Sequence, residues 1–138
     1  MKKEFNKEWK ASNQPRKQRK YRWNATIHLR EKMLSSHLSK DLRKKYSRRS
    51  FGLKKGDTIK IMNGEYKGKT GKVSLVDLKN LRVAIEGIQI TKKEGSKINV
   101  FFKPCKLMIT ELNMEDGKRE QSIKKEKSSQ ENVKESKK

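Results

Sequence analysis

The feature that most constrains this chain is the uneven distribution of its positive charge and its apolar side chains. The 138 residues include 38 Lys and Arg against 16 Asp and Glu, which gives a net charge of +22. Residues 1–50 carry 17 basic and 4 acidic side chains, whereas residues 51–112 hold 25 apolar residues in 62 positions. Only the central part can bury a substantial core, because the rest is too polar to offset its loss of conformational entropy.

These differences divide the chain into three parts. We predict a basic arm over residues 1–50, a folded unit over residues 51–112 and a charged tail over residues 113–138. The tail mixes both signs of charge. We expect it to be disordered or partly helical, with the helical part beginning near Met114. No apolar run is long enough for a membrane span, and Met1–Lys10 lacks the apolar core of a signal peptide.

The start of the arm combines dense positive charge with aromatic residues. Residues 16–23 read Arg-Lys-Gln-Arg-Lys-Tyr-Arg-Trp, and Pro15 precedes them. We expect Met1–Asn24 to lack stable structure in isolation and to order on RNA, with its cations on phosphates and Tyr21 or Trp23 against a base.

Two short helices are predicted in the rest of the arm. Thr26 can cap a helix from Ile27 to about Leu34, and Ser39 can cap a second one. The apolar side of the second helix is formed by Leu38, Leu42 and Tyr46. Its opposite side is basic, which favours contact with phosphate.

Alternating apolar residues after Phe51 predict five or six short strands. The expected strands are Thr58–Met62, Lys69–Leu78, Leu81–Glu86, a fourth through Ile88 and Ile90, Ile98–Phe102 and Leu107–Leu112. No strand precedes a long helix, so we expect a mainly β fold, a small barrel or open roll. Val73 and Leu75 should share one face of their strand, whereas Phe101 and Phe102 should point to opposite faces.

The densest binding pattern lies between Lys55 and Val73. It interleaves glycines and lysines at Gly64, Lys67, Gly68, Lys69, Gly71 and Lys72. Glycine lets a backbone approach phosphate closely and present its N–H groups, and lysine adds point charges. The pattern predicts a hairpin that contacts phosphates and recognises shape. The same glycines can also serve the tight turns of a small barrel, and both roles can hold together.

This segment resembles the KOW motif of ribosomal proteins and transcription elongation factors. The flanking segments Leu38–Tyr46, Ile85–Gln89 and Pro104–Thr110 resemble, in order and spacing, one family of large-subunit ribosomal proteins. That family is number twenty-four in the universal scheme and twenty-six in the eukaryotic one. The resemblance covers about residues 12–120 and is specific to the archaeal and eukaryotic branch.

The resemblance implies an SH3-like barrel in a structural constituent of the large subunit. It also implies binding to the 5′ domain of the large rRNA, an early role in assembly and a place beside the polypeptide exit tunnel. Together with the charge pattern, it predicts RNA contacts in the arm, the glycine-rich hairpin and the turn around Pro104. The predicted RNA-binding residues are Arg16, Lys17, Arg19, Lys20, Arg22, Trp23, Arg30, Lys44, Lys45, Arg48, Arg49, Gly64, Lys67, Gly68, Lys69, Gly71, Lys72, Lys103 and Lys106.

Other functions are less well matched. A KOW-domain transcription protein or a chromatin-associated nucleic-acid-binding protein is the alternative. We expect no enzymatic activity. Cys105 is the only notable nucleophile, and His28 and His37 are 9 positions apart, so they would not share one face of a helix. The single cysteine excludes an internal disulfide framework, fits a reducing compartment and is expected to be a small buried hydrophobe.

No metal site or cofactor is expected, since the chain has no CxxC or HxxxH pattern. The expected partners are large-subunit rRNA and neighbouring ribosomal proteins, with no membrane, no small-molecule substrate and no homo-oligomer. The expected location is the cytoplasm, within the large subunit, with nuclear or nucleolar assembly in a eukaryote.

Overall fold

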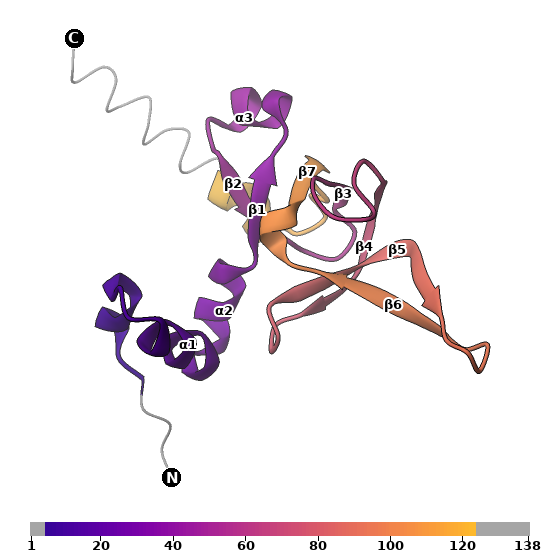
Figure 1. Cartoon of the computed structure of the whole chain (residues 1–138). Coiled ribbons are helices and arrows are strands. Elements are labelled where there is room, and N and C mark those ends of the chain that lie inside the picture. The colour runs from indigo at the N-terminus through magenta and orange to yellow at the C-terminus, as the bar shows by residue number, and fades with distance from the viewer. Residues whose placement is uncertain (1–4, 124–138) are drawn as a thin grey trace.

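The structure is a computed structural model, and it describes residues 5–123 (Figure 1). The tail prediction for residues 124–138 and the arm prediction for residues 1–4 lie outside the described residues. The elements, in chain order, are η1 (Lys7–Ala11), α1 (Pro15–Asn24), α2 (Ile27–Met33), β1 (Ser35–Leu38), α3 (Lys40–Tyr46), β2 (Ser50–Gly52), β3 (Thr58–Ile61), β4 (Thr70–Asp77), β5 (Arg82–Thr91), β6 (Lys97–Phe102), η2 (Pro104–Lys106) and β7 (Leu107–Glu111). A further helix occupies residues 117–123. None of the helices in residues 5–123 is long and apolar enough to cross a membrane.

Seven strands form one sheet in the order β2-β1-β7-β3-β4-β5-β6. All neighbours are antiparallel except β1 and β7, which run parallel with His37 opposite Met108 and Leu38 opposite Ile109. β5 and β6 form a long ribbon that extends away from the other strands (Figure 1). The prediction of a mainly β, barrel-like fold is confirmed.

The core draws on residues from before the predicted start of the β unit. Ile59, Val73 and Ile109 are fully buried in the sheet, and Leu34 and Leu38 are buried with them. We expected no strand before Phe51 and assigned Leu38 to a helix, which is wrong. Leu38 lies in β1 because that strand pairs on both edges, with β2 and with β7, and its side chain then faces the core.

Two strands differ from the sequence prediction, β4 in which side chains share a face and β5 in its length. Val73 and Leu75 do not share a face: Val73 is buried and Leu75 is 49% exposed, because a bulge shifts the pairing of β4 with β5 between them. The two strands expected on either side of Gly87 are one strand, β5, which continues through an irregularity. The prediction that Phe101 and Phe102 point to opposite faces of β6 is confirmed. Phe102 is buried, whereas the Phe101 ring lies on the other side under the Arg82 guanidinium, with the guanidinium carbon 4.0 Å from the ring centroid.

The prediction that Met1–Asn24 lacks stable structure in isolation is wrong for the described residues 5–24, which contain η1 and α1. α1 begins at Pro15, whose ring presets the helical φ angle, and continues through Arg, Lys and Gln, which are good helix formers. The Gln18 amide donates to the carbonyls of Trp9 and Ser12, at 2.8 and 2.7 Å, and so joins α1 to η1. The Ser39 cap is confirmed, since its hydroxyl accepts from the Leu42 N–H.

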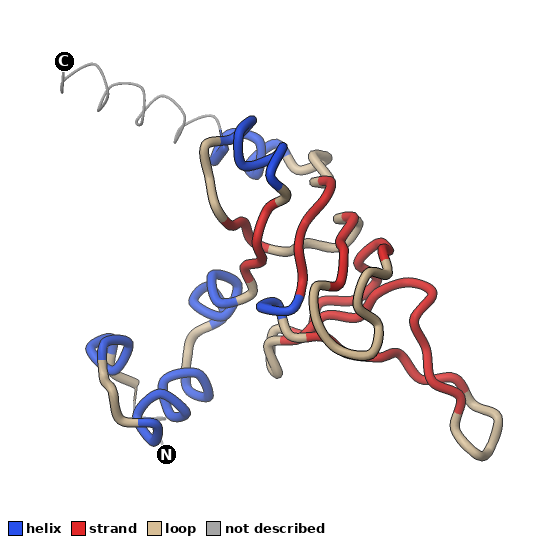
Figure 2. The backbone as a smooth tube through the Cα atoms, turned by 45° about the horizontal axis from the view of Figure 1, so that its top comes forward, coloured by secondary structure: helices blue, strands red, loops and turns tan. Residues whose placement is uncertain are grey.

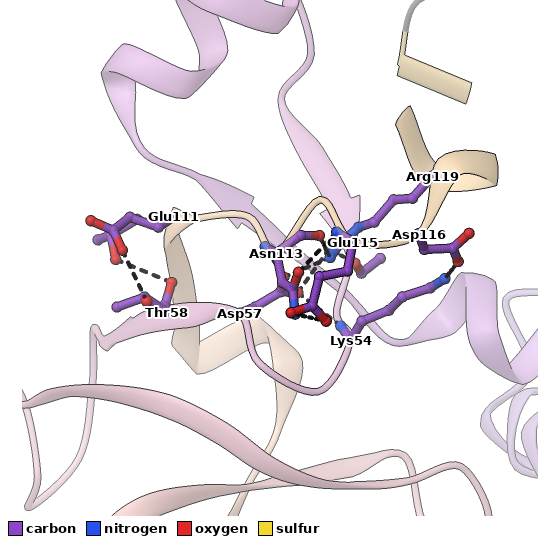
Figure 3. A network of polar contacts seen from close by, with 10 residues as sticks. Lys54, Asp57, Thr58, Glu111, Asn113, Glu115, Asp116 and Arg119 are labelled. Carbon is purple, nitrogen blue, oxygen red and sulfur yellow. Dashed lines mark hydrogen bonds and ion pairs between the residues drawn. The ribbon is translucent and has the colours of Figure 1, made fainter. Parts of the chain in front are cut away.

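A buried ion pair attaches the C-terminal helix to the β unit (Figure 3). Both oxygens of Asp57 accept from the Arg119 guanidinium, at 2.6 and 2.8 Å, and the two side chains are almost completely buried. The Asp57 carboxylate also accepts from the backbone N–H groups of Lys54 and Asn113. Arg119 donates further to the carbonyl oxygens of Asn113 and Gly52. Helix 117–123 is therefore part of the folded unit.

Candidate nucleic-acid interface

The N-terminal helix presents its basic residues to solvent. Arg16, Lys17, Arg19, Lys20 and Arg22 are all on α1, and all five are exposed. The two aromatic residues beside them differ sharply. Tyr21 is buried and stacks on Phe5 with ring centroids 5.3 Å apart, whereas Trp23 is 62% exposed. Of the two candidates for stacking on a base, Trp23 is the accessible one.

The arm, the β4–β5 turn and η2 enclose a groove of about 980 Å³. Four of the predicted arm residues line it, and Lys103 joins them from a distant part of the sequence. The lining residues that carry charge or an aromatic ring are Arg19, Lys20, Arg22, Trp23, Lys79 and Lys103. The structure thus brings together the predicted RNA-binding residues of α1 and Lys103 from the predicted turn around Pro104. It adds Lys79 and Asn80, which the sequence analysis missed because nothing in the sequence of their turn marks it as a neighbour of α1.

Arg30 holds the two sides of this groove together. Its Nε donates to the Ala25 carbonyl at 3.0 Å, and its terminal nitrogens donate to the carbonyls of Lys79, at 3.1 Å, and Trp23. These three carbonyls lie in two segments that are far apart in the sequence. RNA contact by Arg30 stays a prediction, and inside the protein the guanidinium links these two segments.

The β4–β5 turn is fixed by Asp77. Its carboxylate accepts from the Asn80 side chain at 2.8 Å, from Arg82 Nε at 2.9 Å and from the Asn80 backbone N–H at 3.1 Å. These hydrogen bonds, that of the Asn80 side chain first, lower the pKa of Asp77 to about 2. The ionised carboxylate therefore stabilises the turn that carries Lys79 to the groove.

We expect Asp77→Asn to reduce stability at neutral pH by about 1 kcal/mol, since the pair with Arg82 is partly exposed. Because the folded-state pKa lies below that of the unfolded chain, this contribution is present above about pH 4 and is lost as the pH falls towards 2. Melting temperatures of both proteins between pH 7 and pH 2 should converge. Glu94→Gln, in the exposed hairpin loop, is the control and should leave the melting temperature unchanged.

The glycine-rich hairpin presents lysines, but most of its N–H groups act within the turn. Lys67, Lys69 and Lys72 are exposed. The Gly64 N–H donates to its neighbour Asn63 Oδ1 at 2.8 Å, and the Gly68 N–H donates to the Ile61 carbonyl at 2.9 Å. The expectation that these glycines present N–H groups outward is wrong, because the tight turn uses those donors itself. Gly64 and Gly68 have φ angles of 102° and 89°, which explains their identity.

Gly71 is required by close packing. A Cβ atom there would lie 2.7 Å from Ile85 Cγ2 and 3.1 Å from the Glu86 carbonyl oxygen. We expect Gly71→Ala to lower the free energy of unfolding by about 1–3 kcal/mol. Gly52→Ala is the matched control, because a Cβ atom in β2 would meet nothing within 4 Å. Denaturant unfolding of the two variants checks the difference, and equal losses would contradict it.

The turn around η2 links the groove to the hairpin. Lys103 and Lys106 are exposed at its two ends, and the Met62 N–H donates to the Lys106 carbonyl at 2.8 Å. Figure 2 shows this short helix beside the loop that follows β3. The Ser36 hydroxyl anchors the turn by donating to the buried Pro104 carbonyl at 2.7 Å. Cys105 is exposed on this turn, so the expectation that it is buried is wrong.

A second basic cluster lies apart from the groove. Lys44, Lys45 and Arg49 lie on or just after α3, and the Arg48 guanidinium lies over the Phe51 ring at 5.0 Å. α3 lies at the far end of β1 from α1 and α2 (Figure 1). The structure therefore distributes the predicted site residues over separate surfaces. Among residues 5–123, no three His, Cys, Asp or Glu side chains come together as metal ligands would.

Comparison with known proteins identifies the family. The family of eukaryotic ribosomal proteins L26 and their archaeal counterparts matches residues 12–126. A relative in Methanocorpusculum labreanum is 48% identical over 109 residues, covering 79% of this chain and 90% of that protein. One in Methanosphaera stadtmanae is 44% identical over 112 residues, covering 81% and 96%. One in Methanosarcina barkeri is 44% identical over 115 residues, covering 83% and 99%.

All three relatives are named large ribosomal subunit protein uL24. The match spans the basic helix, the sheet and the segment that contains Arg119. The resemblance inferred from the glycine-rich hairpin and its flanks is thereby confirmed. This chain belongs to the ribosomal protein family that comprises L26 of eukaryotes and its archaeal counterparts.

Proposed function

We propose that this protein is a structural constituent of the large ribosomal subunit that binds large-subunit rRNA and has no catalytic role. The observation that carries the proposal is the groove in which cations from α1, the β4–β5 turn and η2 meet beside the exposed Trp23. Such a surface suits a polyanion with accessible bases. The net charge of +22 and the names of the uL24 relatives support the same assignment.

The proposal extends to the surroundings of the protein. We infer contacts with neighbouring large-subunit proteins, binding to the 5′ domain of the large rRNA early in assembly, and a position beside the exit of the polypeptide tunnel. These details rest on the family membership. In a eukaryotic cell, assembly would begin in the nucleus or nucleolus. The alternative of a transcription or chromatin protein receives no support from the relatives, which are named as ribosomal.

Co-sedimentation tests this function. The full-length chain should run with large subunits in a density gradient and remain there after a moderate salt wash, as expected of a structural constituent. A parallel comparison should show tighter binding to large-subunit rRNA fragments than to duplex DNA of equal length at matched salt. Sedimentation only as free protein, or equal affinity for the DNA, would contradict the proposal.

A further inference from the structure

We propose that the groove between α1, the β4–β5 turn and η2 binds a single-stranded segment of RNA, with one unstacked base resting on Trp23. This inference rests on the proposed function and specifies the form of RNA that the site accepts. The juxtaposition of an exposed indole, several cations and apolar lining residues in one groove is its basis.

Trp23 is exposed to an extent that is unusual for tryptophan. Trp23 is the only aromatic residue among the large apolar side chains that the described part of the chain leaves exposed, at 62%. Tryptophan carries a large apolar face that proteins usually bury, so this exposure costs solvation free energy unless a partner covers the ring. A nucleobase is a planar partner of suitable size, and stacking of bases on aromatic side chains is the main contact in single-strand recognition.

The groove is held in shape before any ligand arrives. Arg30 bonds to the carbonyls of Trp23 and Ala25 on one side and of Lys79 on the other. Asp77 fixes the turn on which Lys79 lies through its contacts with Asn80 and Arg82. The end of α1 and the β4–β5 turn are therefore positioned by contacts inside the protein, which reduces the entropy that would otherwise be lost when a ligand orders them.

The chemistry of the lining favours a single strand over a duplex. Met33, Leu81 and Pro104 supply an apolar surface, while Arg22, Lys79 and Lys103 supply charge. A duplex hides the faces of its bases in the stack and offers mainly its phosphates and sugars, so it can engage the cations but not the ring. An extended single strand can place phosphates on the cations and a base on Trp23 at the same time.

Two substitutions at one position separate stacking from charge. Full-length wild type, Trp23→Ala and Trp23→Phe are titrated with a single-stranded RNA and a duplex RNA, each of about ten nucleotides per strand, at matched salt. We expect Trp23→Ala to weaken single-strand binding at least about fivefold and duplex binding less than about twofold. Trp23→Phe keeps an aromatic face and should lose clearly less than Trp23→Ala. Thermal melting confirms that all three proteins are folded, as expected for an exposed side chain.

A charge variant provides the control. Arg16→Gln combined with Lys17→Gln removes two α1 cations that do not line the groove. This double variant should weaken the binding of the single-stranded and the duplex RNA to a similar extent. Equal losses on both RNAs for Trp23→Ala, or equal losses for the Ala and Phe variants, would overturn the single-strand site and leave the proposed function standing. If the wild type bound neither RNA, the proposed function itself would fail, and the inference with it.

Discussion

Replacing Arg119 by methionine is expected to lower the free energy of unfolding by about 3–5 kcal/mol, because it leaves the Asp57 carboxylate buried without its counter-charge. Asp57 is completely buried and receives both ends of the Arg119 guanidinium, at 2.6 and 2.8 Å. The substitution also removes donors from the carbonyls of Gly52 and Asn113. Urea denaturation of the full-length chain measures the loss.

The neighbouring residues provide matched controls. Lys118→Met removes an exposed cation from the same helix, and Asp116→Asn breaks an exposed pair with Lys54 (Figure 3). Exposed ion pairs contribute little because water screens them, so both controls should cost far less than Arg119→Met. Equal losses for Arg119→Met and Lys118→Met would show that the buried pair does not hold the helix in place.

Raising the salt concentration from about 50 to 200 mM is expected to weaken rRNA binding by about a thousandfold or more, if the basic surfaces neutralise six to ten phosphates. The reason is the release of counterions from the RNA, which becomes less favourable as the salt concentration rises. Filter binding or fluorescence anisotropy with a large-subunit rRNA fragment gives the slope of log affinity against log salt.

A single substitution should change this slope in a predictable way. Lys79→Gln removes one groove cation and should reduce the slope by about one unit or slightly less. Lys72→Gln tests the hairpin in the same way, since Lys72 is exposed beside the glycine-rich turn. A slope near zero for the wild type would show that phosphate contacts do not dominate binding.

Local patterns predicted those elements that depend on neighbouring residues. Alternation of apolar side chains located β3, β4, β6 and β7 to within two residues, because a strand with one buried face repeats every second position. The cap at Ser39 was also predictable, since the bond from the Leu42 N–H to the Ser39 hydroxyl spans only three residues. The glycine-rich hairpin was recognised because its glycines and lysines lie close together in the sequence.

Features that depend on distant partners were not predictable in this way. β1 has only four residues, and its strand conformation depends on β2 and on β7, which lies near the other end of the folded unit. The bulge that exposes Leu75 arises from the pairing of two strands and leaves no mark on either one alone. Lys79 and α1 likewise belong to remote segments, which Arg30 of α2 joins through the carbonyls of Lys79 and Trp23.

The parallel pairing of β1 with β7 also sets an order of events during synthesis. A ribosome makes the arm first, yet β1, which follows α2 directly, gains one of its two sheet neighbours only when Leu107–Glu111 has emerged. The Asp57–Arg119 pair requires a few residues more. Until then the chain carries its most basic segment without the pairing that completes the sheet around β1, and a product truncated before β7 would retain the charge of the arm but not that pairing.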